Sequence, residues 1–313
     1  MNGFPALSGF RCGAGLVRLI GHRGARGVMP ENTMAGFGFT LGAGVRALEF
    51  DVVLTGDGIP VVTHNHRLSR STTRTPDGQW MTGVEPKVSS LTYEEIATLD
   101  VGGLDGQTAY GKQFTDQAFI NGLRVPQLAE LLALCAQQDN ADVSLLLELK
   151  SDPELKDDSE ERSKLVAAVV AEVRSYDLTR RTVMHSFDWA LLDECRRHAP
   201  ELPTSYLSEL PANGGAMGEG SSKPVGPDYG TMTGSLPEAV KAAGGQMWCP
   251  IYKDVTADLV AEAHGLGLLV VTWTVNAQAD IEAMIDAGVD GLVTDYPGRV
   301  QHCLLSRKLH WSG

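Results

Sequence analysis

The stretch RALEFDV at residues 46–52 alternates apolar and acidic side chains, which is the pattern of a β-strand. Successive side chains of a strand point to opposite faces, so its leucine, phenylalanine and valine share one face, and Glu49 and Asp51 share the other. Two neighbouring carboxylates on a buried face repel each other and are costly to desolvate unless a cation lies between them. The stretch therefore predicts a buried strand that carries a divalent-metal site with oxygen ligands.

Similar strand-like runs recur along the chain and alternate with amphipathic helical patterns. This order is typical of a parallel sheet with crossover helices, and 313 residues suffice either for two domains or for one enlarged (β/α)8 barrel. Nine strands are one too many for such a barrel, and we expect residues 60–64 to be the surplus, paired beside the preceding strand or extending it. The expected strands are residues 16–21, 46–52, 60–64, 144–150, 182–187, 203–207, 246–250, 268–275 and 291–295, and the expected helices are residues 32–41, 126–137, 160–173, 188–198, 257–265 and 279–287.

The composition is that of an ordinary globular protein. Lys and Arg number 26 and Asp and Glu number 39, so the net charge of −13 argues against a surface for nucleic acid. Hydrophobic residues make up 43 % of the chain, and its strongly apolar runs are too short to span a membrane. The five cysteines show no CxxC spacing, and the first fifteen residues lack the basic and apolar regions of a signal peptide. We therefore expect a cytoplasmic protein, with no prediction of its oligomeric state.

Two long stretches interrupt the alternation of strands and helices. Residues 67–125 are rich in Thr, Gly and Asp, contain one helical turn around residues 93–99, and are too long for an ordinary loop, so we expect an insertion or cap. Residues 208–235 are rich in Gly, Ser and Pro, which indicates a mobile loop. Both stretches follow predicted strands and should lie at the carboxyl end of the barrel, where active sites of this fold are found.

Further polar residues follow predicted strands. His22 and Arg23 end the first strand, and His64 ends the stretch PVVTH; a lone His-Arg pair is more often part of a surface loop. Glu148 and Lys150 share one face of the strand SLLLELK, where they could also form an internal salt bridge. Together with the acidic strand, these residues predict a phosphodiester site. Carboxylates would hold a metal, cations would neutralise phosphoryl oxygens, and histidines would transfer protons.

Several other reaction classes lack their sequence motifs. The chain has no GxSxG nucleophile turn, no GxxxxGK[ST] phosphate loop and no GxGxxG after a strand. Serine hydrolase, P-loop and dinucleotide-binding interpretations are therefore unsupported.

The chain resembles the glycerophosphodiester phosphodiesterases. The segments that carry the resemblance occur in the order of that family and cover nearly the whole chain, and their combination is highly specific. The resemblance implies an α/β (β/α)8 TIM barrel, with residues 1–313 as a single catalytic domain and residues 67–125 as an insertion after the second strand. The matching segments are GHRGARGVMPENT (21–33), LEFDVVLTGDGIPVVTHNHRLSRST (48–72), LLLELK (145–150), VMHSFDW (183–189), TWTVN (272–276) and GVDGLVTDYP (288–297).

The resemblance also implies an activity and residue roles. The activity is metal-dependent hydrolysis of a small-molecule glycerophosphodiester to glycerol 3-phosphate and an alcohol, with one divalent cation, Mg²⁺ or Ca²⁺. The implied roles are metal ligation by Glu49, Asp51 and Glu148, acid–base catalysis by His22 and His64, and substrate contact by Arg23, Lys150 and Trp273.

One position departs from the family pattern in a way that bears on the site. The family usually has Asp directly after the second histidine, and this chain has Asn65, which keeps an oxygen but loses the charge. Two alternatives stay open. The same chemistry could act on lysophospholipids, with residues 208–235 and the insertion forming an acyl groove, or the barrel could bind phosphodiesters without cleaving them.

Overall fold

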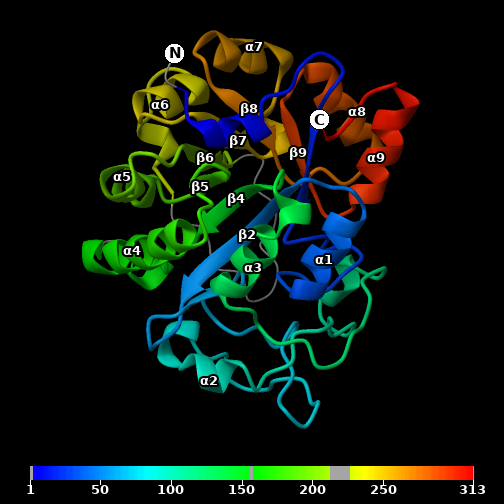
Figure 1. Ribbon diagram of the computed structural model, residues 1–313, viewed down its shortest axis with the longest axis vertical. Helices are drawn as coiled ribbons and strands as arrows, with labels where there is room; N and C mark the ends of the chain where they lie inside the picture. The colour runs from blue at the N-terminus through cyan, green and yellow to red at the C-terminus, as the bar shows by residue number, and fades with distance from the viewer. Residues whose placement is uncertain (1–2, 156–157, 212–225, 313) are drawn as a thin grey trace.

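The chain folds as a closed barrel of parallel strands surrounded by helices (Figure 1). The computed structural model describes residues 3–155, 158–211 and 226–312. Within them, eight parallel strands form the barrel, and the pairing of the first two closes it. The predicted (β/α)8 barrel is confirmed. Its strands are β1 (Arg18–His22), β2 (Ala47–Leu54), β4 (Ser144–Leu149), β5 (Thr182–Ser186), β6 (Thr204–Ser208), β7 (Met247–Pro250), β8 (Leu269–Thr272) and β9 (Gly291–Thr294).

The surplus strand is β3 (Pro60–Val62), as the sequence indicated. It runs antiparallel to β2, with Val53 opposite Val61, after the turn that joins the two strands. Of the two arrangements considered for it, pairing beside the preceding strand is therefore the correct one. His64 lies beyond the end of β3, in the connection that leads into the insertion.

Six predicted helices lie within a few residues of their expected ranges, and two further barrel helices, α6 and α9, were not predicted. Helix α6 begins with a capping box, in which Ser235 and Glu238 bond each other's backbone N–H groups; this pattern was visible in the sequence. Helix α9 begins at Pro297, a favoured first helical residue. The helices are α1 (Met34–Gly42), α2 (Tyr93–Ile96), α3 (Leu128–Cys135), α4 (Ser159–Ser175), α5 (Trp189–His198), α6 (Leu236–Ala242), α7 (Ala257–Gly265), α8 (Gln278–Ala287) and α9 (Pro297–Ser306).

The side chains of the strands divide between two apolar layers. Leu48, Phe50 and Val52 of β2 pack outward in the layer between strands and helices, as the alternation predicts. Leu146 of β4 and Val183 of β5 belong to a separate cluster that fills the barrel interior. The acidic residues of β2 consequently face the interior, above this apolar cluster.

A short amino-terminal segment closes the end of the barrel opposite the acidic residues. The 3-10 helix η1 (Pro5–Gly9) places Leu7 and Phe10 in the interior apolar cluster, and Phe10 is fully buried. Gly9 lies against Ser144, the first residue of β4, so closely that a Cβ atom would meet its Oγ at 1.8 Å. The segment therefore lies at the amino ends of the strands, and the carboxyl ends form the mouth of the barrel.

The insertion of residues 67–125 packs on the β2–β3 hairpin through a small apolar cluster of its own. Leu68, Val88 and Ile96 of the insertion contact Val53 and Val61 of the hairpin in this cluster. Its one α-helix among the described residues is α2, at the helical turn expected there. Figure 1 shows the insertion at one end of the molecule, beyond α1 and α3.

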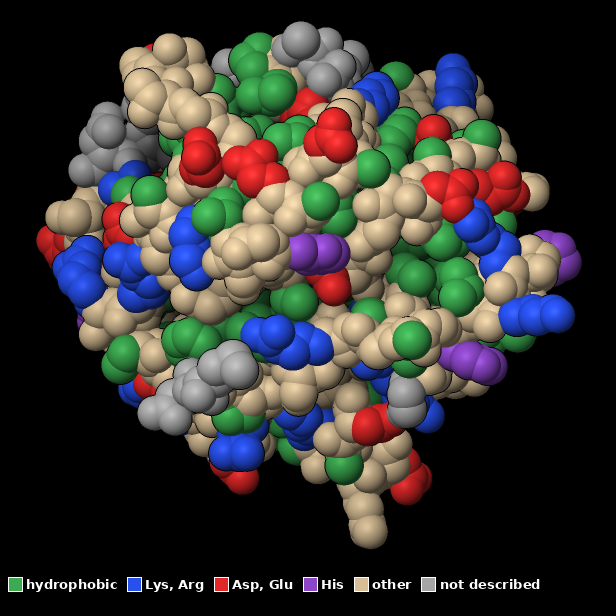
Figure 2. All heavy atoms as spheres, turned by 90° about the horizontal axis from the view of Figure 1, so that it is seen from above, with side chains coloured by type: hydrophobic (Ala, Val, Ile, Leu, Met, Phe, Trp, Pro, Cys, Tyr) green, Lys and Arg blue, Asp and Glu red, His purple; other side chains and the backbone are tan. Residues whose placement is uncertain are grey.

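One face of the molecule shows how its charged side chains are distributed. On the face drawn in Figure 2, acidic and basic side chains are interspersed. Among the described residues, no helix has the length and apolarity needed to cross a membrane. Of the stretch 208–235, which was expected to be a mobile loop, residues 212–225 lie outside the described residues.

Candidate active site

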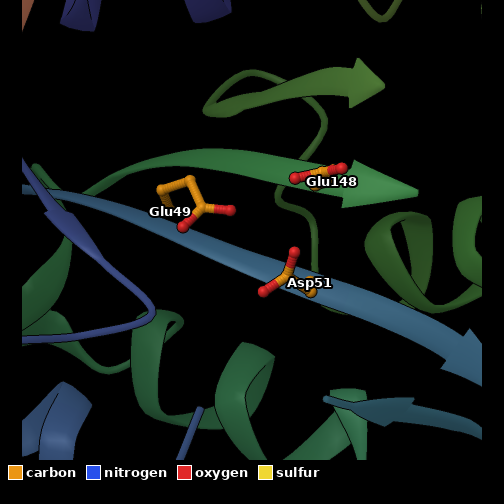
Figure 3. A group of neighbouring side chains, drawn as sticks. All are labelled: Glu49, Asp51 and Glu148. Carbon is orange, nitrogen blue, oxygen red and sulfur yellow. The ribbon is translucent and has the colours of Figure 1, made fainter. Parts of the chain in front are cut away.

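Three buried carboxylates converge inside the mouth of the barrel. Glu49 and Asp51 project from β2 and Glu148 projects from the neighbouring strand β4, where it pairs in register with Asp51 (Figure 3). Each offers an oxygen such that these three atoms all lie within 4.8 Å of one another. None of the three residues is more than 7 % exposed. The alternation that placed both β2 carboxylates on one face thus produces a compact acidic cluster.

The cluster is electrostatically suited to a cation. Burial raises the pKa of Glu49 well above its ordinary value, and the charges of Asp51 and Glu148 raise it further. Burial also raises the pKa of Glu148 to about 7, against the favourable charge of Lys150. Oδ1 of Asp51 is buried and accepts no hydrogen bond from the described residues. An oxygen without a donor, beside two carboxylates that resist ionisation, is the arrangement that a hard divalent ion stabilises.

Two cations lie against the acidic cluster. The backbone N–H of Arg23 donates to Oε2 of Glu49 over 3.0 Å, and its Nε lies 3.3 Å from Oδ2 of Asp51. Lys150 donates from Nζ to Oε1 of Glu148 over 2.8 Å and lies 3.5 Å from Oδ1 of Asp51. Burial opposes ionisation of Asp51, but the nearby positive charges hold its pKa well below the ordinary value. Both residues that are predicted to contact phosphate therefore pair with carboxylates of the acidic cluster.

His22 is held by a carboxylate from the last strand of the barrel. Its Nδ1 donates to Oδ1 of Asp295 over 2.6 Å, and its Nε2 lies 3.8 Å from Oε2 of Glu49. Burial lowers the pKa of His22 to about 4, and the charge of Arg26 contributes in the same direction. Because Nδ1 is occupied by Asp295, Nε2 is the nitrogen that faces the cluster and can exchange a proton there.

His64 has a different partner. Its Nδ1 lies 2.7 Å from Oδ1 of Asn65, the residue that replaces the usual Asp of the family. Burial holds the pKa of His64 well below its ordinary value, and the charges of Arg23 and Lys150 lower it further. The Asn65 oxygen thus contacts the histidine, where it can orient the ring but supplies no negative charge to stabilise an imidazolium.

Trp273 lies beyond the end of β8, across the barrel from β4. Its Nε1 donates to the backbone carbonyl of Cys249 over 3.0 Å, and its ring packs edge-on against Phe187 with centroids 5.4 Å apart. The two aromatic residues pack against the apolar cluster of the barrel interior. The mouth is therefore charged on the side of β1, β2 and β4 and aromatic on the side of Phe187 and Trp273.

Sequence reasoning assigned no role to several residues that the structure brings to the site. Asn32 donates from Nδ2 to Oδ2 of Asp51 over 2.9 Å, and Glu31 accepts a hydrogen bond of 2.8 Å from Arg23. These residues and Asp295 stand in the segments PENT and TDYP, so their motifs were visible although their contacts were not. Tyr110 of the insertion also reaches the site, and no sequence signal marked it.

The carboxyl ends of the barrel strands carry acidic, cationic and histidine side chains. This arrangement is typical of enzymes that hydrolyse phosphate esters. The profile of the Glycerophosphoryl diester phosphodiesterase family matches residues 22–299. The chain belongs to this family and is a phosphoric diester hydrolase.

Individual relatives agree with this assignment. The chain is 30 % identical over 279 residues to a glycerophosphodiester phosphodiesterase of Caldanaerobacter subterraneus, covering 89 % of this chain and 94 % of that one. A crystal structure of a putative glycerophosphoryl diester phosphodiesterase from Silicibacter pomeroyi is 60 % identical, with a TM-score of 0.92 and coverage of 99 % and 100 %. An Oleispira antarctica phosphodiesterase in complex with the product sn-glycerol-3-phosphate shares the fold, with 23 % identity, a TM-score of 0.68 and coverage of 92 % and 97 %.

The metal-free protein should lose stability through Glu148 as the pH rises. Its pKa is about 7 in the folded state against 4.5 ordinarily, so between these values the folded protein binds more protons than the unfolded chain. Stability contributed by this group is therefore present at low pH and lost as the pH approaches 7. With chelator, we expect Glu148→Gln to raise the melting temperature relative to the parent, increasingly from about pH 5 to about pH 7. A difference that does not change with pH would show that Glu148 is ordinarily ionised without metal.

Proposed function

We propose that the chain hydrolyses glycerophosphodiesters to glycerol 3-phosphate and an alcohol, using one divalent cation, Mg²⁺ or Ca²⁺, held by Glu49, Asp51 and Glu148. The observation that carries this proposal is the convergence of the three carboxylates, among them Oδ1 of Asp51, which accepts no hydrogen bond from the described residues. When bound, the cation supplies Lewis-acid stabilisation of negative charge on phosphoryl oxygens. The product complex of the Oleispira phosphodiesterase is consistent with the proposed product class.

Arg23 and Lys150 hold the phosphoryl group in this proposal. Arg23 is buried and Lys150 is mostly buried against the acidic cluster, so their donors are fixed in place before substrate enters. Fixed donors require little reorganisation as negative charge develops on the phosphoryl oxygens, and they therefore lower the barrier. Trp273 and Phe187 form the aromatic side of the mouth, where we place the alcohol.

The two histidines divide acid and base work according to their partners. Burial lowers the pKa of His22 to about 4, but the carboxylate of Asp295 favours positive charge on its ring, so we assign His22 to carry a proton on Nε2 to the departing alcohol oxygen. The hydrogen-bond partner of His64 is the neutral amide of Asn65, and burial together with the charges of Arg23 and Lys150 lowers its pKa against the charge of Asp51, so it stays unprotonated and accepts a proton. This division follows the general rule that paired titratable groups with unlike surroundings take unlike roles.

The nucleophile in this proposal is the glycerol 2-hydroxyl. His64 removes its proton, its oxygen forms a bond to phosphorus, and the bond from phosphorus to the alcohol oxygen breaks as His22 protonates that oxygen. Water then opens the cyclic glycerol phosphate with the histidine roles reversed. An attacking group already attached to the substrate avoids the entropic penalty of positioning a water molecule.

A substrate analogue tests this step. A phosphodiester of propanediol without the free neighbouring hydroxyl should bind, because Arg23, Lys150 and the metal still meet its phosphate. We expect its turnover to be slower than that of the glycerol substrate by at least about 10²-fold, since the intramolecular nucleophile is missing. Comparable turnover of the two compounds would instead indicate direct attack by water, with one histidine as its base.

A comparison of substrates tests the proposed function itself. Glycerophosphodiesters and lysophospholipids should be compared at equal concentration, with and without chelator, by quantifying glycerol 3-phosphate and the released alcohol. Metal-dependent release of glycerol 3-phosphate supports the proposal. Faster cleavage of lysophospholipids would favour the lysophospholipid alternative, and binding without cleavage of either would indicate a non-catalytic barrel.

A further inference from the structure

Tyr110 of the insertion stands at the junction of two charged networks in the mouth of the barrel. Arg26 donates from Nη1 to the Tyr110 hydroxyl over 3.2 Å, and that hydroxyl in turn bonds Oε2 of Glu31. A guanidinium can only donate hydrogen bonds, so the tyrosine oxygen accepts from Arg26 and its proton is given to Glu31. Burial raises the pKa of Tyr110, which keeps this proton in place. The direction of both bonds is thus fixed by chemistry.

One network leads from Tyr110 to a predicted phosphate contact. Oε1 of Glu31 accepts from Nη1 of Arg23 over 2.8 Å while Oε2 accepts from Tyr110. Nε of Arg23 lies 3.3 Å from Oδ2 of Asp51, an ion pair without a hydrogen bond. Glu31 and Asp51 therefore both pair with this guanidinium. Tyr110 in turn donates a hydrogen bond to the Glu31 carboxylate.

The second network leads from Tyr110 to a predicted proton carrier. Arg26 binds Asp295 with two parallel hydrogen bonds, from Nε over 2.9 Å and from Nη2 over 3.0 Å. Asp295 is the residue that orients His22 through Nδ1. The Asp295 side chain is fully buried and that of Arg26 is 12 % exposed, so the pair has little freedom to rearrange. A paired fork of this kind fixes orientation as well as distance.

The insertion is attached to the first βα connection at the point where it presents Tyr110. Gln117 donates to the backbone carbonyl of Arg26 over 2.7 Å, and the Ala118 N–H donates to that of Val28 over 2.9 Å. Phe114 packs edge-on against Tyr110 at 5.4 Å, and the Arg26 guanidinium lies 4.5 Å from its ring centre. The tyrosine is thus placed by the polar contacts of the segment that follows it and by the aromatic contact with Phe114.

We propose that Tyr110 is a positioning residue by which the insertion fixes Arg23, through Glu31, and His22, through Arg26 and Asp295. The inference rests on the proposed function, because it assumes that Arg23 holds phosphate and that His22 transfers a proton. It assigns the insertion a direct part in organising the catalytic groups. Tyr110 itself acts through other residues and is not a catalytic residue.

The test is Tyr110→Phe, which removes the hydroxyl and keeps the ring that packs on Phe114. We expect the inhibition constant of inorganic phosphate to rise about tenfold, and kcat to fall as well, since loss of a supporting hydrogen bond around a site commonly has effects of this size. The matched control is Tyr93→Phe, which removes the hydroxyl of another insertion tyrosine. Its oxygen lies 3.4 Å from Oε1 of Glu130 and from the Val125 carbonyl, away from these networks. We expect parental kinetics for the control.

A second variant separates positioning from a structural contribution. If Tyr110 acts on Arg23 through Glu31, then Tyr110→Phe should weaken phosphate inhibition in the parent but hardly at all when Glu31→Gln is already present. If Tyr110→Phe only lowers the fraction of folded enzyme, kcat will fall and the inhibition constant of phosphate will not change. That result would overturn the inference. Equal effects of Tyr110→Phe in both backgrounds would also overturn it. Failure of the parent to hydrolyse glycerophosphodiesters would instead overturn the proposed function.

Discussion

Replacing Glu148 by Gln is expected to abolish measurable metal binding and to lower kcat/KM by on the order of 10³-fold, while the barrel remains folded. The same result is expected for Glu49→Gln and Asp51→Asn. Each substitution removes one ligand charge and with it the stabilisation by bound metal, whereas in the metal-free cluster it relieves mutual repulsion, so the fold survives. Titration calorimetry with Mg²⁺ and with Ca²⁺ measures the affinity, and circular dichroism checks the fold.

A buried glutamate outside the mouth provides the control for these variants. Glu194 on α5 is 5 % exposed and pairs with Arg197 and His198 of its own helix. Glu194→Gln therefore removes a buried carboxylate without touching the acidic cluster, and we expect parental metal affinity. Unchanged affinity in all three cluster variants would remove the proposed metal site.

His22→Ala and His64→Ala are each expected to lower kcat by at least about 10²-fold, with metal affinity nearly unchanged. The reason is that each ring transfers a proton in one step of the proposed reaction, whereas the ligand oxygens belong to the carboxylates. Steady-state kinetics at saturating metal measure the effect. The outcome that contradicts the proposal is near-parental turnover in either variant, which would make that histidine structural.

The control for the histidine variants is a His–Asp pair on the outside of the barrel. His264 on α7 bonds Oδ2 of Asp290 over 2.9 Å and is exposed, so its pairing resembles that of His22 but at a distance from the mouth. His264→Ala should leave kcat unchanged. A fall in kcat with this control would indicate that loss of any such pair disturbs the barrel as a whole.

Short-range patterns were sufficient to predict much of this fold and of its acidic cluster. The alternation in β2 correctly placed Glu49 and Asp51 inside the barrel and its apolar residues outside, because side-chain direction in a strand is fixed by the backbone. The repeated spacing in β4 added Glu148 for the same reason. The strand count also identified β3 as the strand outside the barrel.

The contacts of Tyr110 could not be predicted in this way. Its hydroxyl meets Glu31 and Arg26, residues 79 and 84 positions away, and no periodicity within either segment records that meeting. The partner of His22 is likewise 273 positions distant, so the motif TDYP was visible in the sequence although the contact of Asp295 was not. Contacts between residues so far apart along the chain depend on how the insertion and the barrel pack in three dimensions.

The amino-terminal segment that closes the end of the barrel opposite the acidic residues has a consequence for how this protein folds. Leu7 and Phe10 can be buried only within a ring of strands, and that ring closes where β1 pairs with β9, with Arg18 opposite Gly291. Contacts between residues so far apart along the chain form late, because the intervening chain must first be ordered. The barrel interior that holds the carboxylates thus forms only after nearly the whole polypeptide has been synthesised. Until then, the apolar residues of the interior and the acidic residues are both exposed to water.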